Sequence, residues 1–229
     1  MRTKILLLTL FISLLFAPNF AGLSQSRSWL RKQIEKNGGY CRNVSITETN
    51  GDLILYGRNA WAASGCPSSL VDALDELNDD REYIDDVVLT ENGDWLILYG
   101  DNGVQWNDIP YSMQKELKRY NNAGEVIYTA TFNDAGDWII ITDEHYSASD
   151  EDILDWLSDG EDSFGELWTA CVTNDAAVAV YEEGYLFLGD VPRSLKRALD
   201  ETSLDVYRLK IAGDAWFFAD EDENCEYYM

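Results

Sequence analysis

The sequence predicts an α+β fold made of a tandem repeat of five units, stacked or closed into a ring. Each unit is expected to hold one helix followed by a two- to three-stranded antiparallel β-meander. Two spacings predict this arrangement. Residues that begin a strand-like run recur at steps of 43, 43, 40 and 39, at Cys41, Ile84, Ile127, Leu167 and Val206. A tyrosine precedes a proline by 11 residues three times, in Tyr56 to Pro67, Tyr99 to Pro110 and Tyr181 to Pro192.

These spacings divide the chain into an expected signal peptide, residues 1–24, and a single repeat domain, residues 25–229. The units are expected at about residues 25–66, 67–109, 110–151, 152–191 and 192–229. No low-complexity linker interrupts them. The sequence therefore predicts one cooperative array rather than separated domains.

The helices are predicted from prolines that are followed by apolar residues at helical spacing. After Pro110, which suits the first position of a helix, Met113, Leu117 and Tyr120 recur at i, i+4 and i+7. The first unit is expected to take its helix from the start of the domain, around residues 29–34. The same spacing follows the other two prolines, at Leu70, Leu74, Leu77, Leu195 and Leu199.

The second strand of each unit is predicted to be apolar on both faces, as in 95–99 and 138–141. A sheet with one solvated face would alternate apolar and polar residues. We therefore expect a helix to cover one face, while the other packs against a neighbouring unit or presents an aromatic surface. The hairpin signal at Asp101-Asn102-Gly103 predicts a short third strand at 104–106.

The clearest copy of the repeat carries its motif at residues 93–95, 98–103 and 109–110. It resembles the G-x-W-x-(I/V)-L-Y-G-x-N-G…I-P units of a group of bacterial secreted tandem-repeat proteins. Later copies depart from the motif, because Thr142 replaces the tyrosine of the third copy and the fourth lacks the tryptophan. The resemblance implies secretion and a repeat architecture, and no activity. The order of one helix and three strands is similar, in topology alone, to PepSY-like inhibitor modules.

The first residues predict export. Arg2 and Lys4 precede the apolar run 5–16, and small residues at 17–24 offer cleavage points. The run is shorter than the ~20 residues that a spanning helix needs. We therefore expect cleavage near residues 21–24, a secreted or periplasmic protein, and no transmembrane anchor in the mature chain.

The charge of the chain restricts its partners. Lys and Arg number 17 against 42 Asp and Glu, which gives a net charge of −25 and a pI near 4.1. Such a surface repels phosphate backbones and anionic lipid headgroups, so a nucleic acid is not expected as a partner. The expected ligand is a protein, peptide or glycan of unknown identity.

Four cysteines, Cys41, Cys66, Cys171 and Cys225, would meet an oxidising compartment after export, and at least one disulfide is expected. Four cysteines allow three full pairings, and the sequence does not choose among them. A Cys41–Cys225 bond would join the first and last units of a ring, whereas Cys41 and Cys66 would lie toward opposite ends of a meander. Metal-binding C-x-x-C spacing is absent, so no metal site is predicted from the cysteines.

Catalytic and metal signals are weak. The one histidine, His145, stands where other copies have a turn and no nucleophile motif accompanies it, so a turn residue is favoured over a catalytic base. No cofactor is predicted. Ca²⁺ is the metal that the acidic runs at 149–152, 159–162 and 220–223 would suit, but none has the spacing of a calcium loop. The first of these runs also suits the first turn of a helix, where acids are favoured.

The tryptophans give the strongest functional signal. Trp61 and Trp106 are predicted on third strands, and Trp95 and Trp138 on second strands 43 residues apart. In an open array such residues would form an exposed aromatic row for a ligand, with core packing as the competing interpretation. The sequence thus favours a secreted, non-enzymatic binding module. The alternatives are a secreted hydrolase that uses carboxylates in a groove between units, and a purely structural surface protein.

Overall fold

The structure is a computed structural model that describes residues 20–229. The expected signal peptide lies outside the described residues except for residues 20–24, which belong to the first helix. Five helices are described: α1 (Phe20–Lys36), α2 (Ser68–Asp79), α3 (Tyr111–Ala123), α4 (Glu151–Phe164) and α5 (Arg193–Glu201). Each precedes one three-stranded antiparallel sheet, so the five predicted helix-plus-meander units are confirmed.

Each sheet is a simple meander whose middle strand is the second in sequence. The strands of the first two units are β1 (Asn43–Ser45), β2 (Asp52–Tyr56), β3 (Ala60–Ser64), β4 (Ile84–Leu89), β5 (Trp95–Tyr99) and β6 (Gly103–Asn107). Those of the third and fourth are β7 (Ile127–Phe132), β8 (Trp138–Thr142), β9 (Tyr146–Ala148), β10 (Leu167–Val172), β11 (Ala176–Tyr181) and β12 (Gly184–Gly189). The fifth unit ends the chain with β13 (Arg208–Ala212), β14 (Ala215–Ala219) and β15 (Cys225–Tyr228).

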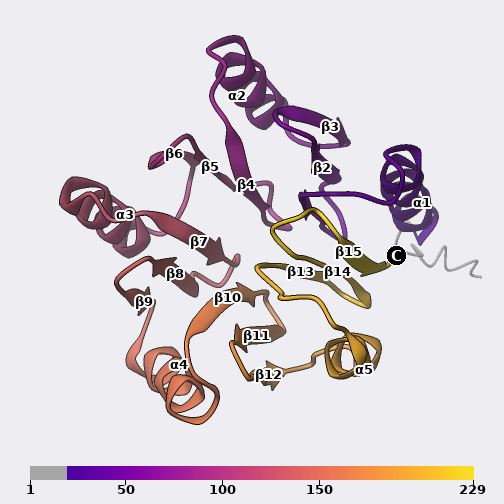
Figure 1. The fold of residues 1–229 in the computed structure, drawn as a ribbon. Helices are drawn as coiled ribbons and strands as arrows, with labels where there is room; N and C mark the ends of the chain where they lie inside the picture. The colour runs from indigo at the N-terminus through magenta and orange to yellow at the C-terminus, as the bar shows by residue number, and fades with distance from the viewer. Residues whose placement is uncertain (1–19) are drawn as a thin grey trace, which may run out of the picture.

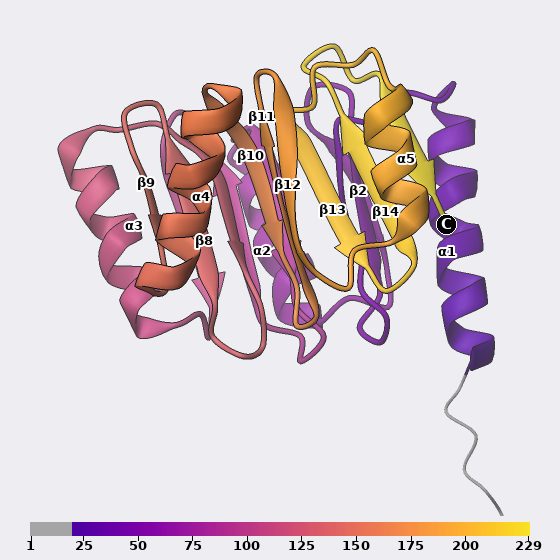
Figure 2. The same ribbon diagram turned by 90° about the horizontal axis from the view of Figure 1, so that it is seen from below.

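The five sheets stand around a central axis like the blades of a propeller, with the helices on the outside (Figure 1). The first strand of each unit lies innermost, and these strands contact one another in the order β1, β4, β7, β10, β13 and back to β1. The sheets remain separate, so the ring is no continuous barrel. Seen from the side, helices and strands run along the same direction as the axis (Figure 2).

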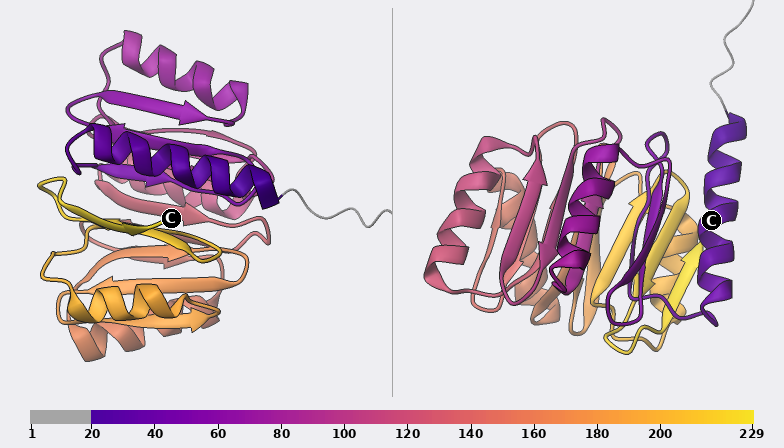
Figure 3. Two further views of the ribbon diagram at one scale, coloured as in Figure 1. Left: turned by 90° about the vertical axis from the view of Figure 1, so that its right-hand side faces the viewer. Right: turned by 90° about the horizontal axis from the view of Figure 1, so that it is seen from above.

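The ring closes where the first and last units meet. Tyr40 forms an antiparallel bridge with Asn224, and the backbone N–H of Cys41 donates to the carbonyl oxygen of Glu223 at 3.1 Å. Arg31 of α1 donates to the carbonyl oxygen of Met229, and the C-terminus lies beside α1 (Figure 3). Of the two predicted arrangements, stack or ring, the structure has the ring.

Closure explains why the second strands are apolar on both faces. Five hydrophobic clusters fill the five gaps between neighbouring sheets, and each includes the helix that enters that gap. In β8, for example, Ile140 packs with α3 and the second sheet, whereas Ile139 packs with α4 and the fourth sheet. Both faces of the middle strands are therefore buried, apart from Tyr56 and Tyr99 at the ends of β2 and β5, which are half-buried.

Local sequence places the helix ends. Pro67, Pro110 and Pro192 stand immediately before α2, α3 and α5. Before α4 the proline is replaced by Asp150, whose side chain accepts from the backbone N–H of Ile153 at 3.0 Å. This cap explains the first acidic run, since the carboxylate there satisfies a helix N-terminus.

Candidate binding site at the axis of the ring

The predicted row of exposed tryptophans is wrong. Trp95 and Trp138 are only 4% and 3% exposed, because both faces of their strands are covered by neighbouring units. Trp61 on β3 and Trp106 on β6 are half-buried and pack against the outer helices of two different gaps. The four side chains are therefore not brought together into one ligand surface.

The middle-strand tryptophans share a structural role that sequence reasoning missed. The indole N–H of Trp95 donates to the hydroxyl of Ser69 at 3.1 Å, and that of Trp138 donates to Ser112 at 2.9 Å. Trp216 makes the same bond to Ser194 in the fifth unit. Each bond ties the middle strand to the first turn of the preceding helix. The signal was a serine that follows each helix-starting proline by two residues.

No disulfide joins the four cysteines, all of which lie in the described part of the chain. Cys66 and Cys225 donate to the carbonyl oxygens of Asp52 and Gly39, both at 3.3 Å. Burial raises the pKa of both thiols to about 11, which keeps them protonated and slow to react. Cys171 on β10 is buried, and burial raises its thiol pKa as well. The disulfide predicted from the export signal is thus not formed.

His145 occupies the turn between β8 and β9, as expected of a turn residue. Its Nδ1 lies 3.1 Å from a Glu125 carboxylate oxygen that also accepts from the hydroxyl of Thr142 at 2.7 Å. Its side chain is 61% exposed, and the hydroxyl of Thr142 accepts from its backbone N–H rather than facing its ring. The acidic run at 220–223 forms a turn around Asp220, which accepts from the backbone N–H groups of Asp222 and Asn224. Within residues 20–229 no three acidic, cysteine or histidine side chains converge on a metal-sized site.

The centre of the ring is filled by a polar network on the inner strands. Lys210 on β13 reaches the carboxylate of Asp86 on β4, with N–O distances of 2.7 and 2.9 Å. Asn43 on β1 donates to the same carboxylate at 2.8 Å. Arg208 forms a second ion pair with Asp85, at 3.0 and 3.1 Å. Because the second and fifth units are not neighbours in the ring, both ion pairs span its centre.

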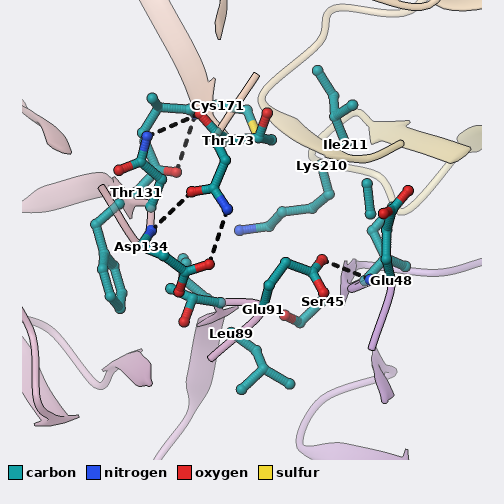
Figure 4. Close-up of a pocket in the computed structure, with 18 of the residues that line it drawn as sticks. Ser45, Glu48, Leu89, Glu91, Thr131, Asp134, Cys171, Thr173, Lys210 and Ile211 are labelled. Carbon is teal, nitrogen blue, oxygen red and sulfur yellow. Dashed lines mark hydrogen bonds between the residues drawn. The ribbon is translucent and has the colours of Figure 1, made fainter. Parts of the chain in front are cut away.

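One mouth of the axis, formed by the hairpins between first and second strands, holds a small pocket of about 150 Å³ (Figure 4). Equivalent hairpin positions of all five units surround it. The carboxylate of Glu91 accepts from the backbone N–H of Glu48, and Asp134 accepts from that of Asn92. Asn174 in turn accepts from the N–H of Asp134 at 3.1 Å. The acidic groups at this mouth therefore link neighbouring units, which leaves them less available to a ligand.

The opposite mouth, where the inner strands begin, holds a larger pocket of about 450 Å³. Its walls carry aromatic side chains from successive units: Tyr83, Tyr99, Tyr128, Trp168 and Tyr207. The rings of Trp168 and Tyr207 stack with centroids 4.9 Å apart and planes 25° from parallel. Tyr83 and Tyr128 are 41% and 47% exposed. This volume is in the range of small-ligand pockets.

β-bulges place the residues of this mouth. The pairing of β4, β7 and β10 with the next strand skips one residue each, at Asp85, Tyr128 and Trp168. A bulge leaves its extra residue unpaired and turns its side chain away from the regular alternation. Three successive units thereby direct a side chain into the same mouth.

Sequence reasoning missed this pocket, although a signal was present. Asp85, Tyr128, Trp168 and Tyr207 each follow a strand-start residue of the repeat by one position. Their steps of 43, 40 and 39 residues match the repeat period. The sequence pattern instead favoured the tryptophans as ligand-binding residues, because they are part of the most conspicuous motif of the repeat.

The comparisons with known proteins add no function to this geometry. No protein-family model matches the chain, and no curated protein matches it. Over the described residues, no helix is both long and apolar enough to span a membrane. The candidate site is therefore argued from its own residues.

Proposed function

We propose that the protein is a secreted, non-enzymatic binding module that holds its ligand in the aromatic pocket at the strand-start mouth of the ring. The observation that carries the proposal is the convergence of Tyr128, Trp168 and Tyr207, from three consecutive units, on one open pocket of about 450 Å³. Rigid aromatic rings provide contact area with little rotamer entropy to lose, which suits them to ligand capture.

A hydrolytic role receives less support from the same pocket. A carboxylate-based hydrolase needs one carboxyl group as an acid and another as a base or nucleophile on either side of the scissile bond. Both carboxylate oxygens of Asp85 accept from Nη2 of Arg208, at 3.0 and 3.1 Å, so this carboxylate is engaged and not free for such a role. The remaining carboxylates, those of Asp101, Glu166 and Glu221, are exposed at the rim. A binding role uses the pocket as it stands.

The test is a set of peptide, glycan and small-molecule arrays probed with the exported protein and with Trp168→Ala. Tyr111→Ala is the matched control, because Tyr111 is 71% exposed on α3 and does not line the pocket. Binding that is lost in Trp168→Ala and kept in Tyr111→Ala supports the proposal. Ligands that bind both variants equally, or no ligand on any array, would leave a purely structural surface protein as the better explanation.

A further inference from the structure

The pocket of the proposed function also indicates what kind of ligand it takes. We propose that it binds an organic cation, an alkylammonium or guanidinium group, against the faces of Trp168, Tyr207 and Tyr128. This inference rests on the proposed function and names its ligand class.

The aromatic geometry fits a cation. A positive group within ~6 Å of a ring centroid is attracted by the negative face of the ring. Trp168 and Tyr207 stack on each other at 4.9 Å between centroids, which leaves at most the outer face of each ring for a ligand, and Tyr128 on the adjacent unit is 47% exposed. A cation held between this stacked pair and Tyr128 would contact more than one ring at once.

The charge around the pocket favours the same class. Four carboxylates line it, those of Asp85, Asp101, Glu166 and Glu221, against the single guanidinium of Arg208. Arg208 is already paired with Asp85, and none of the other three carboxylates forms an ion pair within residues 20–229. The pocket is therefore net negative on a chain of net charge −25, and it repels anions while attracting cations.

The pKa of Tyr207, which stacks on Trp168, is affected by the same negative charge. Burial, followed by the nearby carboxylates of Glu221, Asp205 and Glu166, raises the pKa of the Tyr207 hydroxyl above its ordinary value. The carboxylates that raise this pKa would also attract a positively charged ligand to the neighbouring rings. A neutral sugar would use the ring faces but would gain little from the surrounding negative charge, so the cation makes fuller use of this pocket.

The test compares choline chloride with 3,3-dimethyl-1-butanol, its uncharged isostere, by titration of tryptophan fluorescence in the full protein. Choline is expected to bind at least about tenfold more tightly than the alcohol, and its affinity is expected to fall as salt is added. A second titration uses a peptide that carries trimethyllysine, and its control is the same peptide with glycine at that position. This comparison shows whether the cation comes from a small molecule or from a peptide side chain. Binding of either cation supports the proposal.

Variants assign the binding to the pocket. Trp168→Phe, which keeps an aromatic face, should weaken choline binding less than Trp168→Ala, and Glu221→Gln should weaken it several-fold. Glu201→Gln, which removes an exposed carboxylate on α5 away from the pocket, is the matched control and should change nothing. Glu221 is exposed, so its variant is expected to fold even where Trp168→Ala does not.

Two failures are distinguishable. If neither cation binds up to about 10 mM while a neutral array ligand is lost in Trp168→Ala, the cation inference is overturned and the binding module stands. If neither the cations nor any array ligand depends on Trp168, both proposals are overturned.

Discussion

Lys210 and Asp86 form the ion pair on which we expect the closed ring to depend most. The carboxylate is 4% exposed and the lysine side chain 12%, and the nearest N–O distance is 2.7 Å. At an effective dielectric constant of about 20, the gross attraction at this distance is about 6 kcal/mol, part of which offsets the desolvation of both groups. Lys210→Met leaves the carboxylate buried, with the side-chain amide of Asn43 still donating to it at 2.8 Å.

Removing one member of a buried pair costs about 3–5 kcal/mol. For a domain of this size that loss lowers the midpoint of thermal unfolding by about 6–20 °C. Asp86→Asn in the Lys210→Met background removes the uncompensated charge, and we expect it to recover much of the loss. Thermal and urea unfolding of the two single variants and the double variant complete a double-mutant cycle.

The control is the exposed ion pair between Arg119 and Glu116 on α3, whose side chains are 53% and 32% exposed. Arg119→Met should cost no more than about 0.5 kcal/mol, because solvent screens a surface pair. The reasoning is refuted if Lys210→Met costs no more than Arg119→Met, or if the double variant is as unstable as the sum of the single ones.

Three other predictions concern the units themselves. Trp95→Ala and Trp138→Ala should each cost about 3–5 kcal/mol in urea unfolding, and Ser69→Ala and Ser112→Ala about 0.5–1.5 kcal/mol; a small loss for the tryptophan variants would contradict their placement in the core. Burial and the carboxylates of Asp108 and Asp134 raise the pKa of Asp94, so its ionised form lowers stability as the pH rises through that pKa. Asp94→Asn should therefore raise the midpoint of thermal unfolding at pH 7, and this gain should disappear in acid. Asp137→Asn, at the equivalent position of the third unit, should lower the midpoint because Asp137 accepts from Asn133 at 2.9 Å. A shift in the same direction for both variants would contradict the different roles of the two carboxylates. Gly160→Ala should destabilise α4 although alanine favours helices, because its Cβ would lie 2.2 Å from the ring of Tyr181; calorimetry showing a stabilised variant would exclude that contact.

The sequence predicted the units because their signals are local. A proline followed by apolar residues at helical spacing, and a hairpin signal such as Asp101-Asn102-Gly103, act over a few residues and recur with the period. The β6 strand (Gly103–Asn107) and the left-handed Gly124 at the end of α3 follow from such signals. The apolar residues on both faces of the second strand also predicted two alternatives for its uncovered face, packing against a neighbouring unit or an exposed aromatic surface, and the first is found.

The site could not be predicted in the same way, because it depends on how units sit around the axis. The bulges that expel Asp85, Tyr128 and Trp168 from the ladder have no sequence signal of their own. The partner of Asp86 lies 124 residues away in a unit that is not its neighbour. Closure of the ring also explains why the prediction for Trp95 was wrong. An open array would expose the tryptophans of the second strands, whereas a closed ring buries them in the core.

Gly213 shows how the fifth unit departs from the repeat so that the ring can close. Its position corresponds to Glu48, Glu91, Asp134 and Asn174 in the other hairpins. It has φ +54°, and a Cβ there would lie 1.9 Å from a carboxylate oxygen of Glu48. Gly213→Ala should therefore cost about 1–3 kcal/mol for the backbone strain, together with the displacement of Glu48 from its place near Arg27.

Gly57→Ala separates these two causes, because Gly57 has φ +55°, close to that of Gly213, and open space around its Cβ position. It should show the strain alone. Glu48→Ala in the Gly213→Ala background should recover the part due to the clash, measured by urea unfolding as a double-mutant cycle. Equal losses for Gly213→Ala and Gly57→Ala, with no recovery in the double variant, would mean that the junction of the first and last units does not require a glycine for the approach of Glu48.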